Sequence, residues 1–351
     1  MWNIISSTYV LLLISFGFVN SDPKVPCFFI FGDSYSDAGN NNDLITVAKA
    51  NYPPYGVDFP GGLATGRFTN GLTIIDIITG LLGIKELIPP FNKASGADIL
   101  KGVNYASGSA GILPETSSYV GDRIWLARQV QNHETTILEL QSFVKGPVSN
   151  YLNKCLYSVN IGTNDYVNNY FLPQLSISPE KVLNPDEFAT TLVAKYEQLL
   201  KKLYNYGARK TVIFGLANIG CLPAPAIREH KIPCVEEINQ AVQLFNEKLL
   251  SLVNSLNLQL DGAKFTFIDT MAMHPPTRFL LDYTTDATCC KINIGYLCKP
   301  FSTPCPDRNL YAYMDGFHAT EAFYQHIAIS SFNSPSNMFV HPVDINTLVS
   351  S

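Results

Sequence analysis

The chain has 351 residues, of which 46% are hydrophobic, 12% aromatic and 15% charged, so it can bury a sizeable core and lacks the composition of a disordered protein. Its formal net charge is −5, and it contains no basic run. Both features argue against a nucleic-acid partner and against an anionic membrane surface as a partner.

The N-terminal segment contains an apolar run from Thr8 to Val19, which polar residues follow. A run of about twelve residues is too short to span a bilayer but suits the apolar region of a secretory signal. One feature disagrees, because residues 1–10 contain no Lys or Arg, and a buried N-terminal helix is the alternative. We predict a signal peptide over residues 1–21, secretion of the protein, and no transmembrane anchor, because no later apolar stretch reaches about 18 residues.

Four apolar runs alternate with helical patterns along the rest of the chain. They predict strands at residues 27–31, 155–161, 210–216 and 263–269. Helices are predicted at residues 73–82, 185–206, 235–256 and 321–331, and long loops at residues 39–71 and 270–313. The helix over 185–206 has Asn184 as its N-cap, Pro185 in its first turn and Gly207 just past its end.

Strands that are apolar on both faces and alternate with helices indicate a parallel sheet covered on both sides. The chain shows no internal repeat and no low-complexity linker, so residues 22–351 are predicted to form one α/β domain. In such sheets, ligands bind beyond the carboxyl ends of the strands.

The eight cysteines are an even number in a chain predicted to be secreted, which favours disulfides. Their possible pairings number about 105, so the sequence leaves the connectivity open. Cys221 and Cys234 bracket a short proline-containing loop that a bond could close. A zinc cluster over residues 289–305 is the rival interpretation, although the CxxC and His spacings that zinc prefers are missing.

Ser34 lies one short turn after the first predicted strand. A nucleophilic serine needs an exposed hydroxyl, a rigid backbone and a nearby N–H group for the developing oxyanion, and a strand-to-helix turn supplies all three. Taken alone, Ser34 fits a helix N-cap equally well.

Two further segments offer hydrogen-bond donors. The glycine-rich residues 102–111 would let a backbone N–H approach a substrate oxygen, and the side chain of Asn164, after the second predicted strand, can donate to an oxyanion. In isolation, an ordinary turn and an Asx-turn explain these two segments.

Asp315 and His318 are three positions apart in a predicted loop. At that spacing the carboxylate can hold one imidazole nitrogen while the other faces Ser34. The chain has six histidines, and His318 is the one with a carboxylate just upstream in a loop before a helix. A lone surface histidine is the alternative.

Together these segments resemble, in residues and in order, the plant GDSL esterase/lipase family of the SGNH hydrolases. The resemblance also includes residues 40–42, 66–71 and 220–223. It implies the SGNH hydrolase fold, a flavodoxin-like three-layer α/β/α sandwich with a mostly parallel sheet. It also implies that Cys27 and Cys155, which begin neighbouring strands of that fold, are bonded.

The resemblance further implies a carboxylic ester hydrolase that acts on acyl or acetyl esters, lipids among them, through an acyl-enzyme and without metal or cofactor. In it, Ser34 is the nucleophile, His318 the base and Asp315 its orienting partner. The N–H groups of Ser34 and Gly108 and the amide of Asn164 form the oxyanion hole.

Three positions depart from the family pattern: Tyr35 replaces Leu, Met314 replaces a frequent Trp, and Ala319 replaces a frequent Pro. The last two could loosen the loop that aims His318, so a non-catalytic binding member of the family is one alternative. An acyltransferase that uses the same residues is another. The α/β-hydrolase interpretation fails, because the chain contains no Gly-x-Ser-x-Gly. Specificity is expected in the loops 43–65, 112–130 and 270–312, and the oligomeric state stays open.

Overall fold

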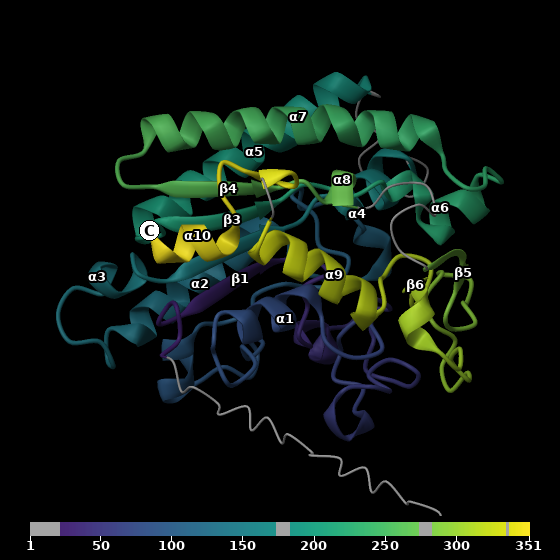
Figure 1. Ribbon diagram of the computed structural model, residues 1–351, viewed down its shortest axis with the longest axis horizontal. Coiled ribbons are helices and arrows are strands. Elements are labelled where there is room, and N and C mark those ends of the chain that lie inside the picture. Colours follow the sequence, from purple (N-terminus) through teal and green to yellow (C-terminus); the bar gives the residue numbers. More distant parts are fainter. Residues whose placement is uncertain (1–21, 173–182, 274–282, 335–336) are drawn as a thin grey trace, which may run out of the picture.

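The computed structural model describes residues 22–172, 183–273, 283–334 and 337–351 (Figure 1). The predicted signal peptide, residues 1–21, lies outside the described residues.

The centre of the fold is a five-stranded sheet in the order β1-β2-β3-β4-β7. The first four strands are parallel and β7 is antiparallel to β4. Their bounds are Phe28–Gly32, Leu156–Asn160, Lys210–Phe214, Lys264–Ile268 and Val340–His341. The four predicted strands are confirmed; β1 is displaced by one residue, and each of the other three is two residues shorter than expected.

A further stretch of backbone runs parallel to β1 on its outer side. Ile30 donates its N–H to the carbonyl of Val103 at 3.0 Å, and Tyr105 donates to the carbonyl of Ile30 at 2.8 Å. With this stretch included, the parallel strands follow the 2-1-3-4-5 order of flavodoxin-like sheets. The predicted fold class is therefore confirmed.

Helices cover both faces of the sheet (Figure 1). The α2, α5 and α7 helices pack together on one face, and α1, α9 and α10 on the other. All residues of β1 and β2 are buried, which explains why β1 is apolar along its length rather than alternating. The six helices span Leu126–Leu140, Pro185–Tyr206, Glu236–Gln259, Ile74–Leu81, Glu321–Phe332 and Ile345–Ser350.

The best predicted helix is α5, whose bounds match the expectation at both ends. The Asn184 side chain accepts the N–H of Glu187, whose own side chain accepts the Asn184 N–H, and Gly207 ends the helix with φ 118°. These capping residues adjoin the helix in the sequence, so both ends of the helix could be predicted without the tertiary structure.

The α2 helix was not predicted, and its first residues fall in the expected loop 112–130. The residue before the helix is Trp125, which makes no side-chain cap, and the buried face includes Gln129 and His133. Polar residues on the buried face interrupt the apolar periodicity by which a helix is recognised.

The segment predicted as a loop over residues 270–313 contains a small parallel sheet of β5 (Thr284–Thr288) and β6 (Tyr311–Tyr313). The remaining helices are short: α3 (Ser149–Leu152), α4 (Thr163–Asp165), α6 (Pro223–Arg228) and α8 (Thr270–Met273). Over residues 39–71 the regular structure consists of two 3₁₀ turns, so this loop prediction is confirmed.

All eight cysteines are paired in disulfides, which excludes the zinc alternative for residues 289–305. The expected bond between Cys27 and Cys155 joins the starts of β1 and β2. The other three bonds are Cys221–Cys234, Cys289–Cys305 and Cys290–Cys298.

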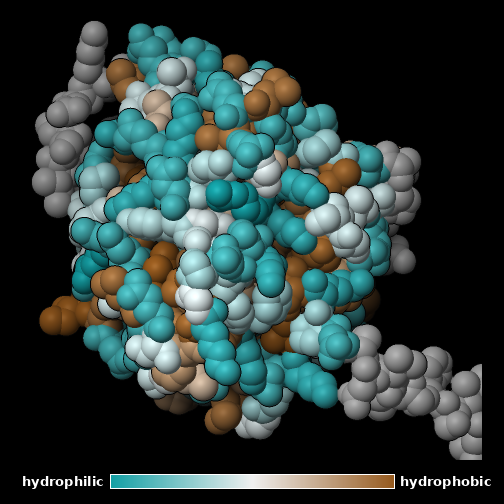
Figure 2. Space-filling view, turned by 90° about the vertical axis from the view of Figure 1, so that its left-hand side faces the viewer, coloured by the Kyte–Doolittle hydropathy of each residue, from teal (hydrophilic) through white to brown (hydrophobic). Residues whose placement is uncertain are grey.

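The surface at the amino ends of the parallel strands is mixed in hydropathy. At the amino ends of the parallel strands, hydrophobic side chains are scattered among hydrophilic ones on the surface (Figure 2). Within the described parts of the chain, no helix has the length and apolar character needed to cross a membrane.

Candidate active site

Three of the predicted site residues line one cleft at the carboxyl ends of the strands. The cleft has a volume of ≈ 640 Å³, and its lining includes Ser34, Asn164 and His318. Ser34 follows β1, Asn164 lies in α4 just after β2, and His318 precedes α9. Crossover connections place these segments together although they are far apart in the sequence.

Ser34, His318 and Asp315 form a continuous hydrogen-bonded line. The Nε2 atom of His318 lies 2.8 Å from the Ser34 Oγ, and its Nδ1 atom lies 2.9 Å and 2.8 Å from the two oxygens of Asp315. Asp315 is fully buried and His318 is 3% exposed, whereas Ser34 is half-buried in the cleft wall. The hydroxyl therefore faces the cleft, and the groups behind it are shielded from water.

The loop that carries Asp315 and His318 closes on itself. Asp315 Oδ1 accepts the backbone N–H groups of Phe317 and His318 at 2.8 and 2.9 Å. Met314 donates its N–H to the His318 carbonyl at 2.8 Å. Met314 is fully buried and Ala319 is bridged to β6, so both departures from the family pattern are accommodated in a tight loop.

The turn that carries Ser34 is fixed by its backbone. Asp33 donates its N–H to the carbonyl of Asn160 at 3.1 Å, and a Cβ on Gly32 would come within 2.6 Å of the same carbonyl. The residues after Ser34 form turns and then a 3₁₀ helix at Asn40–Asp43. The expected strand-to-helix turn is therefore a strand-to-loop turn, and hydrogen bonds to β2 and from Asn104 hold it in place.

Asn164 has a fixed amide orientation. Its Oδ1 accepts a hydrogen bond from Asn168 at 2.8 Å, and its Nδ2 donates to the carbonyl of Ala110 at 3.0 Å. An amide NH₂ has two hydrogens, so a second donor is available where Asn164 lines the cleft.

The backbone N–H of Gly108, predicted as an oxyanion donor, has a carboxylate partner in the structure. Its N–H donates to Asp37 Oδ2 at 3.0 Å, and the residue does not line the cleft. The next residue, Ser109, does line the cleft and has φ +61°, in the left-handed region of backbone conformation. The glycine-rich sequence predicted a close backbone approach, but it did not indicate which residue of the turn lines the cleft.

Two buried carboxylates, which the sequence analysis did not single out, organise these loops. Asp37 accepts the N–H groups of Gly39 and Asn40, each at 2.7 Å, besides that of Gly108. Asp165 accepts the N–H groups of residues 112 and 113. Burial raises the pKa of each carboxyl to about 6, against the opposing effect of these donors.

His133 shows what the remaining histidines can do instead. It is fully buried against Phe29 and Phe31, its Nδ1 lies 3.1 Å from the Tyr105 hydroxyl, and burial lowers its pKa to about 3. His133 is therefore a neutral core residue, remote from the hydrogen-bonded line of Ser34.

Tyr55 was missed by sequence analysis. Its hydroxyl donates to Asp315 Oδ2 at 2.5 Å across 260 residues of sequence. The Phe68 ring, 4.8 Å from the His318 imidazole, packs beside it. Neither residue carries a local signal for this position, because both lie in the long loop before α1.

No group of three or more His, Cys, Asp or Glu side chains in the described segments is arranged to hold a metal ion. The cleft is lined by a serine hydroxyl, an imidazole with a carboxylate behind it, and an amide, and Arg228 lines it as well. A serine, an imidazole and a carboxylate in this order are the set found in serine hydrolases.

Comparison with known proteins gives the family. The family described as GDSL-like Lipase/Acylhydrolase matches residues 28–330. Two GDSL esterase/lipases of Arabidopsis thaliana are 44% and 43% identical to the chain; the matches cover 97% and 93% of this chain and 96% and 93% of those proteins. The chain belongs to the GDSL-like lipase/acylhydrolase family, whose members are carboxylic ester hydrolases.

Solved structures add only a distant likeness. A carbohydrate acetylesterase from Sinorhizobium meliloti has a TM-score of 0.38 at 12% identity, over 86% of this chain and 94% of that one. Phospholipase A1 from Streptomyces albidoflavus has a TM-score of 0.37 at 14% identity, over the same shares. Scores this low carry no inference about substrate.

Proposed function

We propose that this protein hydrolyses carboxylic esters with Ser34 as the nucleophile, His318 as the general base and Asp315 as the group that orients the imidazole. The observation that carries the proposal is the hydrogen-bonded line from Ser34 Oγ through both nitrogens of His318 to a fully buried carboxylate. A carboxylate at Nδ1 fixes the tautomer in which Nε2 can accept the serine proton.

The reaction proceeds through two acyl transfers. In the first, Ser34 Oγ attacks the ester carbonyl carbon while His318 takes the hydroxyl proton. The tetrahedral intermediate then breaks its bond to the alcohol oxygen, which leaves with the proton from His318. In the second, His318 deprotonates a water molecule that attacks the acyl-enzyme and releases the acid and the free serine.

The negative charge of each tetrahedral intermediate needs donors. We assign this role to the backbone N–H groups of Ser34 and Ser109 and to the second hydrogen of the Asn164 amide. Ser109 takes the place first predicted for Gly108, because Asp37 occupies the Gly108 N–H. Donors fixed before the reaction need no reorganisation when the charge develops.

The lining of the cleft favours an apolar acyl group. Aliphatic and aromatic side chains make up most of it, among them Val47, Val120, Leu172, Ile294, Leu297, Tyr119 and Phe317. Several of them, such as Ile294 at 97% exposure, are solvent-exposed side chains on loops. They can pack against an acyl chain with little change in the backbone. Acyl esters, lipids included, are therefore the proposed substrates.

The test is a panel of nitrophenyl esters of graded acyl length, assayed with the wild type and with Ser34→Ala. The wild type is expected to turn over at least one ester, and the variant to lose activity by several orders of magnitude while keeping its thermal midpoint. A fluorophosphonate probe should label the wild type alone. Undiminished turnover by Ser34→Ala would exclude Ser34 as the nucleophile, and the absence of both labelling and turnover in the wild type would favour a non-catalytic member.

An acyltransferase would use the same residues, so it is separated from a hydrolase by product analysis with water and alcohol acceptors together. We also propose that the protein is secreted. The four disulfides support this proposal, because such bonds persist in oxidising compartments.

A further inference from the structure

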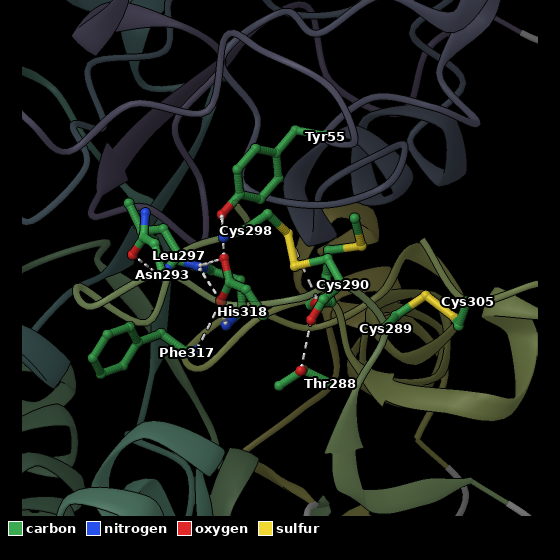
Figure 3. Close-up of a disulfide and its surroundings, with 12 residues drawn as sticks. Tyr55, Thr288, Cys289, Cys290, Asn293, Leu297, Cys298, Cys305, Phe317 and His318 are labelled. Atoms are coloured by element: carbon green, nitrogen blue, oxygen red, sulfur yellow. Dashed lines mark hydrogen bonds and ion pairs between the residues drawn. A yellow bond between two sulfur atoms is a disulfide. The ribbon is translucent and has the colours of Figure 1, made fainter. Parts of the chain in front are cut away.

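Tyr55 connects the loop before α1 to the carboxylate of the proposed triad. The residue is 1% exposed. Its hydroxyl donates to Asp315 Oδ2 at 2.5 Å and accepts the backbone N–H of Cys298 at 3.0 Å. Figure 3 shows the Tyr55 hydroxyl between Cys298 and the loop that carries His318.

The direction of the Tyr55 proton is fixed by its two partners. A backbone N–H can only donate, so the phenol oxygen must accept from Cys298 and must direct its own hydrogen at Asp315. Burial, and then the Asp315 charge, raise the pKa of Tyr55 well above its ordinary value. The phenol therefore remains a donor throughout the pH range of an ester assay.

The partner that holds Tyr55 is itself covalently anchored. Cys298 is bonded to Cys290, whose N–H donates to the carbonyl of Met314 at 3.0 Å, directly before Asp315. The neighbouring disulfide, Cys289–Cys305, is tied to β6 in the same way, through the Cys289 N–H and the carbonyl of Tyr313. The disulfide-bonded segment is thus hydrogen-bonded to the residues just before Asp315. Cys298, in the same segment, donates to the Tyr55 hydroxyl (Figure 3).

The two oxygens of Asp315 are held differently. Oδ1 accepts N–H groups from its own loop, at residues 317 and 318. Oδ2 accepts the Tyr55 hydroxyl, which comes from a distant part of the chain. Both oxygens also contact His318 Nδ1. The plane of the carboxylate, and with it the aim of the imidazole, therefore depends on a donor outside the loop.

We infer that Tyr55 is a positioning residue for ester hydrolysis, which orients Asp315 and draws part of the carboxylate charge away from His318. The inference rests on the proposed function. Tyr55 does not line the cleft, so it acts through Asp315 and His318 rather than on the substrate.

The other ionisable groups around this site are three tyrosines and Asp33, the residue before Ser34, whose pKa burial raises to about 8. Tyr35 and Tyr324 lie on the side of Ser34, and Tyr52 is in the same loop as Tyr55. Burial is the main cause that raises the pKa of each of them, so they stay neutral at the pH of the assay. Asp33 is the same in the wild type and the variants, so the difference between the pH profiles of the wild type and Tyr55→Phe reports the change at Asp315.

The test replaces Tyr55 with Phe, and Tyr52→Phe is the matched control. Tyr52 lies in the same loop and donates its hydroxyl to the carbonyl of Cys298 at 3.0 Å. We expect Tyr55→Phe to lower kcat about tenfold with KM within about twofold, the effect of losing one hydrogen bond to a charged group. The acid limb of the kcat/KM profile should move to higher pH, because a carboxylate with one donor fewer stabilises the protonated imidazole more strongly. Tyr52→Phe should change neither quantity.

A second variant covers the case in which Tyr55→Phe fails to fold. Incorporation of 3-fluorotyrosine at position 55 keeps the hydroxyl and makes it a stronger donor, so the acid limb should move to lower pH. An unchanged kcat and an unchanged pH profile in folded Tyr55→Phe would overturn the inference, as would a shift in the same direction for both variants. Because the wild type and Ser34→Ala are assayed in parallel, failure of the proposed function would appear as loss of their difference.

Discussion

Replacing Arg67 with methionine tests the buried ion pair beside the site. The Arg67 Nε and Nη2 atoms donate to the two oxygens of Asp76 at 2.7 and 2.8 Å, and both side chains are about 5–6% exposed. Asp76 also belongs to the capping box of α1, where it accepts the N–H and hydroxyl of Thr73. The substitution leaves this carboxylate buried with Thr73 as its remaining partner.

The expected loss of unfolding free energy is about 3–5 kcal/mol, the typical cost of removing one partner of a buried pair. The loss should depend on pH in a defined direction. Burial alone would raise the pKa of Asp76, but the Arg67 charge and the hydrogen bonds hold it below its ordinary value of 3.8. A carboxyl with a lowered pKa stabilises the folded state at pH values above its ordinary pKa. This stabilisation is lost as the pH falls and the carboxyl becomes protonated in the folded protein. The difference between wild type and variant should therefore narrow below about pH 4.

The assay is urea unfolding of the wild type, Arg67→Met, Asp76→Asn and the double variant at pH 7 and at pH 3.5. The double-mutant cycle isolates the coupling between the two side chains from the separate effect of each substitution. A loss below about 1 kcal/mol for Arg67→Met at pH 7, or a loss that grows at pH 3.5, would refute the reasoning. Ester hydrolysis per folded molecule would be measured for the same variants. Retained activity would indicate that Phe68, next to Arg67, still packs against the His318 imidazole.

Two further predictions concern the site and the disulfides. Asn164→Ala should lower kcat about 10²- to 10³-fold with little change in KM, because it removes a donor needed mainly in the transition state; an equal effect on KM would contradict that role. Replacing Cys27 and Cys155 together by Ala should cost about 5 kcal/mol in unfolding free energy, since the bond closes 128 residues. The matched pair Cys221 and Cys234 closes 13 residues and should cost about 3 kcal/mol, so a larger loss for this short loop in urea unfolding would count against the chain-entropy argument.

The overall architecture could be predicted from the amino-acid sequence, and so could the local part of the candidate site. β1 carries a continuous apolar run because it is buried on both faces, and α5 carries both of its end signals within a few residues. Asp315 and His318 are also local, since three positions separate them and their own loop holds them together. Features of this kind depend on neighbours in the sequence, so they can be predicted from it.

Tertiary structure decided which groups face the cleft and what holds them. The N–H of Gly108 is taken by Asp37, 71 residues away, and Ser109 lines the cleft instead. Tyr55 reaches Asp315 across 260 residues, and α2 buries Gln129 so that it can donate to the carbonyl of Gly32, 97 residues away. These partners are chosen by how the loops pack on the finished sheet. No periodicity or motif in the sequence records that packing, because the free energy of each contact depends on groups that become neighbours only when the chain has folded.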